Sequence, residues 1–522
     1  MQTSMYVNSL YAIVPPLLAI VLAVVSRRII LSLFVGIILG ALMINHFDVF
    51  LTGKDIGLRF MSFIVDSSGH LNDFNLPVLL FLIFLGMTIS LINLSGSTLA
   101  VAKWAKEKIK TRKQARLMTM LLGIIIFVDD YFNTLTVGTI VKPITDEQKV
   151  SREELAYGID STAGPICSLM PISSWGAYLI GIMTSILATL NIYDISPLTL
   201  FFTVMSMNYY AFFALFFLLG VILFNIQLKP MNKAFLRSVN EALLWNPKLG
   251  VPIGTHSVNE TEHNQSAIGL IMPIGILIVS NFFFIGFFGF NNVDHTTNYS
   301  LVDIISNTDT TLSIFYSSIL SVISALIYNI YLQKNVKQIL GVMLAGAKSM
   351  LPAIYILLCA WTIAGIMTDL KTGNYLASLI GRTLPQFIIP ALIFLLAGIA
   401  AFSTGTSWGT FAIMLPIAAD IGMQYDVNMV MILMSAVISG SIFGDHSSPI
   451  SDTTCLSATG AGCHHIDHVI TQLPYAFVAA MVTLMTFLVL GITQKAVLSF
   501  VFGVVLLFIV IKVLSKKYSI VN

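Results

Sequence analysis

The stretch Gly-Asp-His-Ser-Ser-Pro-Ile-Ser-Asp-Thr-Thr at residues 444–454 decides the fold of this chain. It places two carboxylates, one imidazole and five hydroxyls in eleven residues, and residues 427–443 before it carry no charge. A polar island between segments as apolar as a membrane interior is costly to bury, and such islands mark functional sites. We therefore predict that residues 444–454 form part of an ion site at the middle depth of a membrane.

Composition predicts a protein that crosses the membrane many times. Of the 522 residues, 57% are hydrophobic and 10% are charged, and the mean hydropathy is +0.89. Soluble domains carry about 25% charged residues. The net charge of +2 is uninformative about partners, and we expect no nucleic acid among them. We find no nucleophile–base pair and no phosphate-binding loop, so we do not expect an enzyme.

The apolar segments predict an all-α architecture, because none of them alternates with the period of a membrane barrel. Several segments are too short to span a bilayer alone, and others are interrupted by Asp, Asn, Ser, Gly or Pro. We therefore expect roughly eleven to thirteen crossings, with broken helices and re-entrant helical hairpins.

A polar linker divides the chain into two expected halves. Residues 1–224 form the first half, with a broken helix and hairpin at 117–190. Residues 225–265 form a cytoplasmic linker. Residues 266–522 form the second half, with a broken helix and hairpin at 386–470. Segments interrupted by Gly and Pro in corresponding places of two halves are typical of inverted-repeat transporters. The repeated Pro-Ile-Ser at 171–173 and 449–451 fits this pattern, although the matches share no single offset.

Lys and Arg predict the orientation, because they are enriched in cytoplasmic loops. The most basic loop spans residues 103–116, and further basic residues lie in 225–248 and at 512–517. Residues 290–311 contain three Asp and no Lys or Arg. We expect a multi-pass protein of the bacterial cytoplasmic membrane, with the N-terminus outside and the C-terminus in the cytoplasm.

Oxygen-bearing side chains at membrane depth predict a site for a hard cation such as Na⁺. The candidate cation-binding or substrate-binding residues are Asp129, Asp130, Asn133, Asp160, Ser173, Ser174, Thr404, Thr406, Ser407, Asp445, His446, Ser447, Ser448, Ser451, Asp452 and Thr453. The preferred Na⁺ ligands among them are Asp130, Asn133, Ser448 and Asp452, and Asp452 is expected nearer the cation than Asp445. No cofactor is expected besides the ion. The competing interpretation puts the Asp129–Asp130 pair at a membrane interface.

The histidines leave two alternatives open. His446 either titrates beside Asp445 or serves as a hydrogen-bonding scaffold for the unwound segment. Cys463, His464, His465 and His468 contain an i, i+4 histidine pair that suits a metal. We favour a solvated loop there, because Asp467 and the lack of apolar flanks indicate the surface.

Four stretches resemble the NhaC-type Na⁺/H⁺ antiporter family of the wider ion-transporter superfamily. They are residues 127–138 (FVDDYFNTLTVG), 160–165 (DSTAGP), 171–175 (PISSW) and 443–454 (FGDHSSPISDTT). The resemblance implies an all-helical secondary transporter with inverted repeats and two helical hairpins, often a homodimer. Similar proteins exchange organic acids or move amino acids, so the resemblance indicates the mechanism class better than the substrate.

Two functions follow from these observations. The first is Na⁺/H⁺ antiport by alternating access, in which a buried carboxylate binds either cation, because desolvation disfavours its charged form. The alternative is Na⁺- or H⁺-coupled transport or exchange of a small organic acid or amino acid. The lack of membrane Lys or Arg favours the first. Under either function, we expect the break at 129–133 to approach residues 444–454 near the bilayer midplane.

Overall fold

The computed structural model describes residues 6–26, 28–65, 69–73, 75–97, 100–101, 103, 108–252, 266–293, 304, 307–372, 375 and 385–520. Among them the regular structure is helical, with two isolated β-bridges, so the predicted all-α class is confirmed. Four charged residues that supported the orientation, namely Arg27, Lys106, Asp294 and Asp303, lie outside the described residues.

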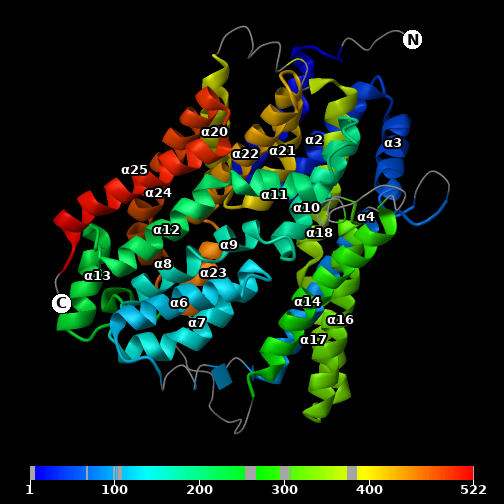
Figure 1. Cartoon of the computed structure of the whole chain (residues 1–522). Helices are drawn as coiled ribbons and strands as arrows, with labels where there is room; N and C mark the ends of the chain where they lie inside the picture. Colours follow the sequence, from blue (N-terminus) through cyan, green and yellow to red (C-terminus); the bar gives the residue numbers. More distant parts are fainter. Residues whose placement is uncertain are drawn as a thin grey trace.

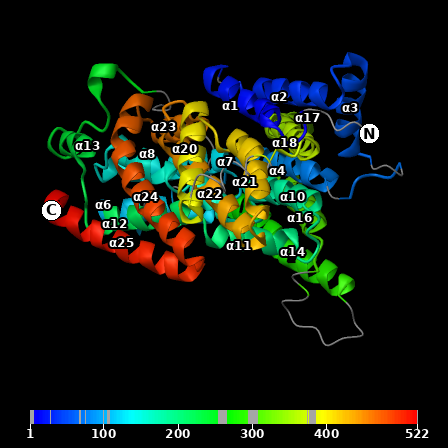
Figure 2. The same cartoon turned by 90° about the horizontal axis from the view of Figure 1, so that it is seen from above.

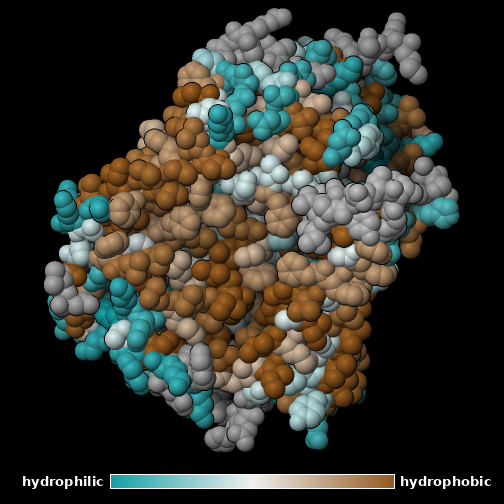
Figure 3. Space-filling view, in the orientation of Figure 1, coloured by the Kyte–Doolittle hydropathy of each residue, from teal (hydrophilic) through white to brown (hydrophobic). Residues whose placement is uncertain are grey.

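A wide apolar surface identifies the chain as a polytopic membrane protein. Nine stretches of the described residues are helical, long and apolar enough to cross a bilayer, or ten if the pair α11–α12, bent by 48°, is one span. Three shorter apolar helices add to them, and whether these cross completely stays a prediction. Hydrophobic residues cover the middle of the face shown in Figure 3, while hydrophilic residues gather toward its top and lower left.

One group of long helices packs together at one side of the molecule (Figure 1). This group consists of α4 (Asn75–Ser95), α14 (Ile268–Asn292), α16 (Thr310–Tyr331) and α17 (Val336–Ser349). A second set packs beside it, comprising η1 (Leu10–Ile13), α1 (Val14–Ser26), α2 (Ile29–Ile44), α3 (Val49–Ser62) and α18 (Leu351–Asp369). Because α18 also contacts α10 and α21, these helices flank the part of the chain that holds the polar motifs.

The first half contains a helical hairpin made of α6 (Arg112–Ile125) and α7 (Asp130–Glu147). Arg112 at the start of α6 donates to the carbonyl of Lys149 just after α7, so the two helices are antiparallel. The tip lies at residues 126–129. Asp129 caps α7 by accepting from the backbone N–H of Phe132, which satisfies one of the N–H groups that a helix start leaves unpaired.

A broken helix follows the first hairpin. Its three pieces are α8 (Arg152–Asp160), α9 (Gly164–Leu169) and α10 (Ser174–Thr189). Ser151 and Glu154 form a capping box at the start of α8, and Ser173 caps α10 through the N–H of Gly176. α11 (Pro197–Ser206) and α12 (Tyr209–Leu223) then complete the half. The sequence therefore breaks this helix twice, once on either side of α9.

The second half has a corresponding arrangement. α20 (Ile389–Thr404) and α21 (Ser407–Met423) form its hairpin, after the short η3 (Gln386–Ile388). Gly405 turns the chain at the tip with φ of 71°, and a Cβ there would lie 2.5 Å from the carbonyl oxygen of Ile450. The broken helix follows as α22 (Val427–Ser447) and α23 (Asp452–Ala461). Hairpins were predicted within 117–190 and 386–470; the first hairpin spans residues 112–147 and so begins before the predicted range, and the second spans residues 389–423.

The two halves pack against each other through α7 and α23. A Cβ at Gly138 of α7 would lie 2.5 Å from the carbonyl carbon of Gly460 in α23, so this crossing requires glycine. Both helices begin at the polar motifs and run the same way, because residues 130 and 453 meet at one end and residues 138 and 460 further along. α24 (His465–Thr493) and α25 (Ala496–Tyr518) close the chain (Figure 2).

The linker contains a helix that lies beside the end of the chain. The described part of residues 225–265 includes α13 (Lys229–Asn240) and η2 (Pro247–Leu249). Ile226 pairs with Ser519 in an isolated bridge, and Lys113 donates to the carbonyl of Leu223. Three basic segments thus share one side of the protein. The division into halves 1–224 and 266–522 stays a prediction.

Candidate functional site

The helix starts of α7 and α23 meet at a buried carboxylate. Thr453 Oγ1 donates to Asp130 Oδ2 at 2.8 Å, and both residues are buried. Asp130 is the first residue of α7 and Thr453 the second residue of α23, so the contact joins the hairpin of the first half to the broken helix of the second. Helix N-termini stabilise negative charge, which makes this a suitable place for a carboxylate in an apolar surrounding.

A second buried carboxylate lies at the tip of the other hairpin. Asp445 Oδ2 accepts from the backbone N–H of Ser407 at 3.0 Å and from Ser407 Oγ at 2.8 Å. Ser407 begins α21, and Asp445 lies in the last turn of α22. The hydroxyl and the N–H of Ser407 compensate part of the charge of Asp445, because hydrogen bonds to ionised groups are stronger than neutral ones.

A third buried carboxylate, Asp160 at the end of α8, is held by donors from the second half. Asp160 Oδ2 accepts from Gln472 Nε2 at 2.6 Å and from Thr454 Oγ1 at 3.1 Å. His468 Nε2 lies 3.2 Å from the same oxygen. With three polar neighbours on one oxygen, the carboxylate is fixed in orientation although residues about 300 positions apart surround it.

His446 connects the helix breaks to α12. Its ring lies 3.2 Å from Ser161 Oγ and 2.8 Å from Tyr210 Oη. Its backbone carbonyl accepts from Gln472 Nε2 at 2.5 Å. Gln472 therefore bonds to Asp160 at the end of α8 and to the last turn of α22 at once, which ties the two broken helices together.

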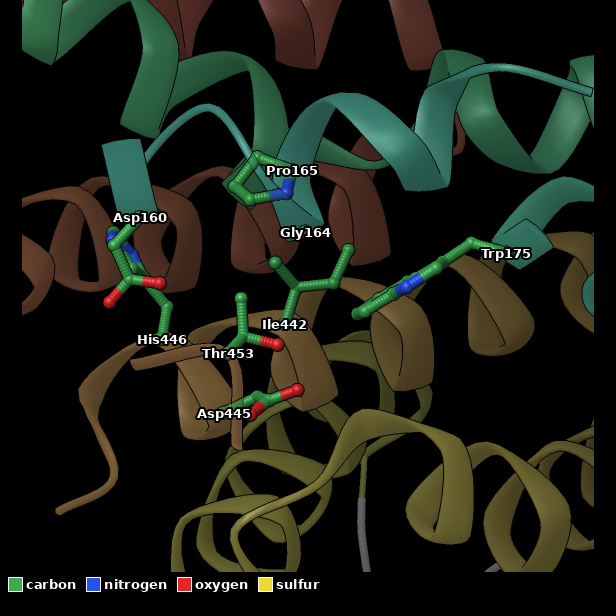
Figure 4. A pocket seen from close by; sticks show the side chains of 8 residues that line it. All are labelled: Asp160, Gly164, Pro165, Trp175, Ile442, Asp445, His446 and Thr453. Atoms are coloured by element: carbon green, nitrogen blue, oxygen red, sulfur yellow. The ribbon is translucent and has the colours of Figure 1, made fainter. Parts of the chain in front are cut away.

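Two of the three carboxylates, Asp160 and Asp445, line a small cavity of about 10 Å³, and Asp130 adjoins it through Thr453 (Figure 4). Asp160, Asp445, His446 and Thr453 line it together with Gly164, Pro165, Trp175 and Ile442. Figure 4 shows Asp160 and His446 at one end and the ring of Trp175 at the other, with Thr453 and Asp445 along the side. The volume suffices for one water-sized particle.

The chemistry of the lining favours a small cation. Its polar groups include two carboxylates and one hydroxyl, and no Lys or Arg side chain lines it. Asp130 stands behind the Thr453 hydroxyl and adds a third carboxylate to the same region. A hard cation takes oxygen ligands of this kind. The described residues contain no group of three His, Cys, Asp or Glu arranged to hold a metal ion.

Several predicted residues stabilise the helix breaks of the first half. Asn133 Nδ2 donates to the carbonyls of Gly123 and Ile126, while its Oδ1 is buried without a partner. Asp129 accepts from Ser174 Oγ at 2.8 Å, so it links the hairpin tip to the start of α10. Ser173 donates to the carbonyl of Cys167. The Asp129–Asp130 pair is buried within the protein, and its depth in the membrane stays a prediction.

The remaining predicted residues of the second half lie outside the cavity lining. Four hydroxyls bond to the nearby backbone, from Thr404 to Ala400, Ser447 to Phe443, Ser448 to Phe402, and Ser451 as the cap of α23. Thr406 precedes α21 with an extended backbone. Asp452, by contrast, is exposed and accepts from Tyr131 Oη at 3.3 Å. Of the four preferred Na⁺ ligands, only Asp130 lies beside the cavity lining through a direct hydrogen bond.

Four residues of the site were missed from the sequence: Tyr210, Thr454, His468 and Gln472. The expectation that the segment 463–468 is a solvated loop is wrong for His468, which is 0% exposed and lies in the first turns of α24. His468 and Gln472 have i, i+4 spacing, which puts both on one face of a helix. That spacing, followed by a long apolar run, was the signal that could have revealed them.

The fold and the site define a secondary transporter: many apolar helices, two hairpins with adjoining broken helices, and a carboxylate cavity where they meet. The chain belongs to the Na⁺/H⁺ antiporter family, whose sequence model matches residues 166–492. This confirms the family that the sequence motifs indicated.

Known proteins agree with this assignment. The chain is 38% identical over 515 residues to a protein of Haemophilus influenzae named only as an uncharacterized protein, covering 98% of this chain and 96% of that one. It is 30% identical over 176 residues to the malate-2H⁺/Na⁺-lactate antiporter of Bacillus subtilis, covering 32% of this chain and 36% of that one. The YdaH transporter of Alcanivorax borkumensis has a similar fold, with a TM-score of 0.52 at 12% identity over 84% of this chain and 87% of that one.

Proposed function

We propose that this protein exchanges Na⁺ for H⁺ across the bacterial cytoplasmic membrane, with the cation in the cavity between Asp160 and Asp445. The observation that carries the proposal is a cavity of about 10 Å³ lined by two buried carboxylates and the hydroxyl of Thr453. A Na⁺ ion without its hydration shell fits a cavity of this volume, and oxygen ligands replace the water molecules that the ion loses. The preferred ligands therefore become Asp160, Asp445 and Thr453, supported by Asp130.

The same carboxylates serve the proton. An ionised carboxylate in an apolar surrounding is costly unless a cation neutralises it, and either Na⁺ or H⁺ does so. Binding of one cation therefore displaces the other, which is the requirement for exchange. Residues of both broken helices line this cavity, so movement of one half against the other would open it to alternate sides.

Proteoliposomes with a trapped pH-sensitive dye test this function. A Na⁺ gradient across vesicles that contain the protein, with no organic solute present, is expected to change the internal pH, whereas an equal K⁺ gradient is not. Vesicles with the Asp445→Asn protein serve as the control for leakage. A pH that stays constant under the Na⁺ gradient contradicts Na⁺/H⁺ exchange.

The second candidate function is exchange of a small organic acid or amino acid coupled to Na⁺ or H⁺. The name of the Bacillus subtilis relative favours it, since that protein exchanges malate with protons for lactate with Na⁺. The size of the cavity argues against it, because about 10 Å³ has no room for a carboxylic acid of several atoms. Uptake of labelled malate, lactate or arginine into the same vesicles decides the matter, and Na⁺-dependent uptake would support this candidate.

A further inference from the structure

Two layers of contacts join α7 to α23 at their first turns. The inner layer is the buried hydrogen bond between Thr453 and Asp130 at 2.8 Å. The outer layer joins the adjacent residues: Tyr131, one position after Asp130, donates through Oη to Oδ2 of Asp452, one position before Thr453, at 3.3 Å. Tyr131 is 40% exposed and Asp452 is also exposed. Since consecutive residues of a helix point about 100° apart, each helix presents one partner to the cavity and the other outward.

The outward face of the α7–α23 pair carries polar side chains on both helices, with Leu135 of α7, 41% exposed, between Tyr131 and Thr139. Below Asp452 it presents Cys455 and Thr459 on α23, which follow the spacing of one helix face. On α7, Thr139 lies on the same outer side as Tyr131, two turns further along. The hydroxyls of Thr139 and Thr459 both bond to their own helix backbone, at Leu135 and Cys455, in an exposed position.

This face ends at the side that carries the basic segments. Arg152 at the start of α8 donates to Asp146 Oδ2 near the end of α7 and to the carbonyl of Ala461 at the end of α23, both at 2.7 Å. Arg112 of α6, in the basic loop, bonds to Glu154 of the same α8. The α7–α23 face therefore runs from the site to the surface of residues 103–116, which the charge distribution predicts to be cytoplasmic.

An exposed carboxylate at the level of the site needs water. A charged side chain in contact with lipid chains costs several kcal/mol, and irregular or polar surfaces at membrane depth are tolerated where they line a water-filled space. Asp452 accepts from Tyr131, the neighbour of Asp130, and Asp130 accepts from Thr453, the neighbour of Asp452. Asp452 therefore lies at nearly the same depth as the buried carboxylate of Asp130. Water must then reach Asp452 along the face that continues from it.

We propose that the outward face of α7 and α23 lines the aqueous route by which the cation reaches the site. Asp452 is the first carboxylate that meets the ion, and the hydrogen bond from Tyr131 closes the passage between α7 and α23. Breaking that bond exposes the neighbouring pair Asp130–Thr453, whose oxygens then take over from water. The route depends on the proposed function only for the nature of the ion, because its accessibility to water is a property of the fold.

Labelling of the native Cys455 tests the route without any transport. Among the four cysteines, Cys455 is exposed, and Cys167, Cys359 and Cys463 are buried. A membrane-impermeant maleimide is expected to label Cys455 from the side of residues 103–116, in vesicles of one orientation and not of the other. The Cys455→Ser protein gives the background. Labelling no faster than this background in both vesicle orientations would overturn the proposal, since lipid or protein would then cover the face.

The tyrosine contact is tested by the rate of the same labelling. Tyr131→Phe removes the hydrogen bond and keeps the ring, so a cysteine behind this bond, introduced as Thr453→Cys in the Cys455→Ser protein, is expected to react about two- to tenfold faster, the effect of one net hydrogen bond. Thr139→Val, on the same face but without a contact to Asp452, is the matched control. An unchanged rate in Tyr131→Phe contradicts the closing role of the tyrosine.

The role of Asp452 is tested by flux in vesicles. Asp452→Asn is expected to raise the KM for Na⁺ about fivefold, as for a partly exposed charge, and to leave the maximal rate nearly unchanged. Asp452→Glu restores the low KM. Loss of all transport in a folded Asp452→Asn protein that still labels at Cys455 would overturn the proposal, because Asp452 would then be a ligand of the central site.

If wild-type vesicles exchange no Na⁺ although Cys455 labels as expected, the proposed function fails and the route stands.

Discussion

Thr453 Oγ1 lies 2.8 Å from Asp130 Oδ2, and 323 positions of sequence separate these two residues. The bond joins the first turn of the hairpin helix α7 to the first turn of the broken helix α23. The break at 129–133 was predicted to approach residues 444–454, and this contact joins the two segments. Both partners are buried, so each satisfies a polar group that would be costly alone.

Asp445→Asn is expected to abolish exchange or to weaken the apparent Na⁺ affinity about 10- to 100-fold, because a charged ligand contributes roughly 1.5–3 kcal/mol. The amide keeps the size of the carboxylate and an acceptor for Ser407, so the fold should persist. Vesicle flux against Na⁺ concentration measures the effect. The exposed Asp426, which caps α22 through Met429, provides the matched control, since Asp426→Asn should leave the flux curve near that of the wild type. Near-normal flux in Asp445→Asn would contradict the proposed site.

Thr453→Ala is expected to lower stability by about 1–3 kcal/mol and to impair transport, because Asp130 Oδ2 loses its buried donor. Thr453→Ser keeps the hydroxyl and should behave nearly as the wild type. Thermal unfolding in detergent and vesicle flux measure the two effects. Equal behaviour of the alanine and serine proteins would mean that the hydroxyl contributes nothing at this position.

Gln472→Leu is expected to reduce the rate of exchange, because the variant removes the donor shared by Asp160 and the carbonyl of His446. The two helix breaks would then be free to separate, because Asp160 keeps Thr454 as a donor but the link to the carbonyl of His446 is lost. Thr471→Val is the matched control, since the Thr471 hydroxyl bonds to carbonyls of its own helix. The prediction fails if both variants transport at the same rate.

Gly138→Ala is expected to destabilise the protein by about 1–3 kcal/mol, since an added Cβ would overlap the backbone of Gly460. Gly275→Ala in α14 is the control, because nothing lies within 4 Å of a Cβ there and alanine is the better helix former. Thermal unfolding should show a lower Tm for the first variant and an equal or higher Tm for the second. If both variants have the same Tm, the close packing of α7 on α23 is not rigid.

Orientation is tested with cysteines introduced into the Cys455→Ser protein. Asn292→Cys at the end of α14 is expected to react with an impermeant reagent from outside the cell. Lys248→Cys, in the exposed linker before α14, should react only from the cytoplasm. The reverse pattern would mean that the distribution of Lys and Arg does not determine the topology of this chain.

The class of the protein, and the helix breaks that contribute carboxylates to the site, follow from the amino-acid sequence alone. Some apolar runs are too long for the core of a soluble protein, and charged residues lie inside them. These features indicate a membrane protein with a functional site whatever the packing, because the bilayer penalises unpaired polar groups wherever they lie. Both hairpins, and helix breaks at 161–163, 170–173 and 448–451, could therefore be expected from Gly, Pro, Ser and Asp alone.

Only the tertiary structure decided which oxygens converge. Asp452 and Thr453 are neighbours in the sequence, yet one side chain is exposed and the other is buried beside Asp130, because a helix turns about 100° per residue. Asp160 lines the cavity, whereas Asn133 and Ser448, which were the preferred ligands, bond to backbone carbonyls. The spacing of His468 and Gln472 places them on one helix face, but they reach the site because α24 packs against α8 and α22.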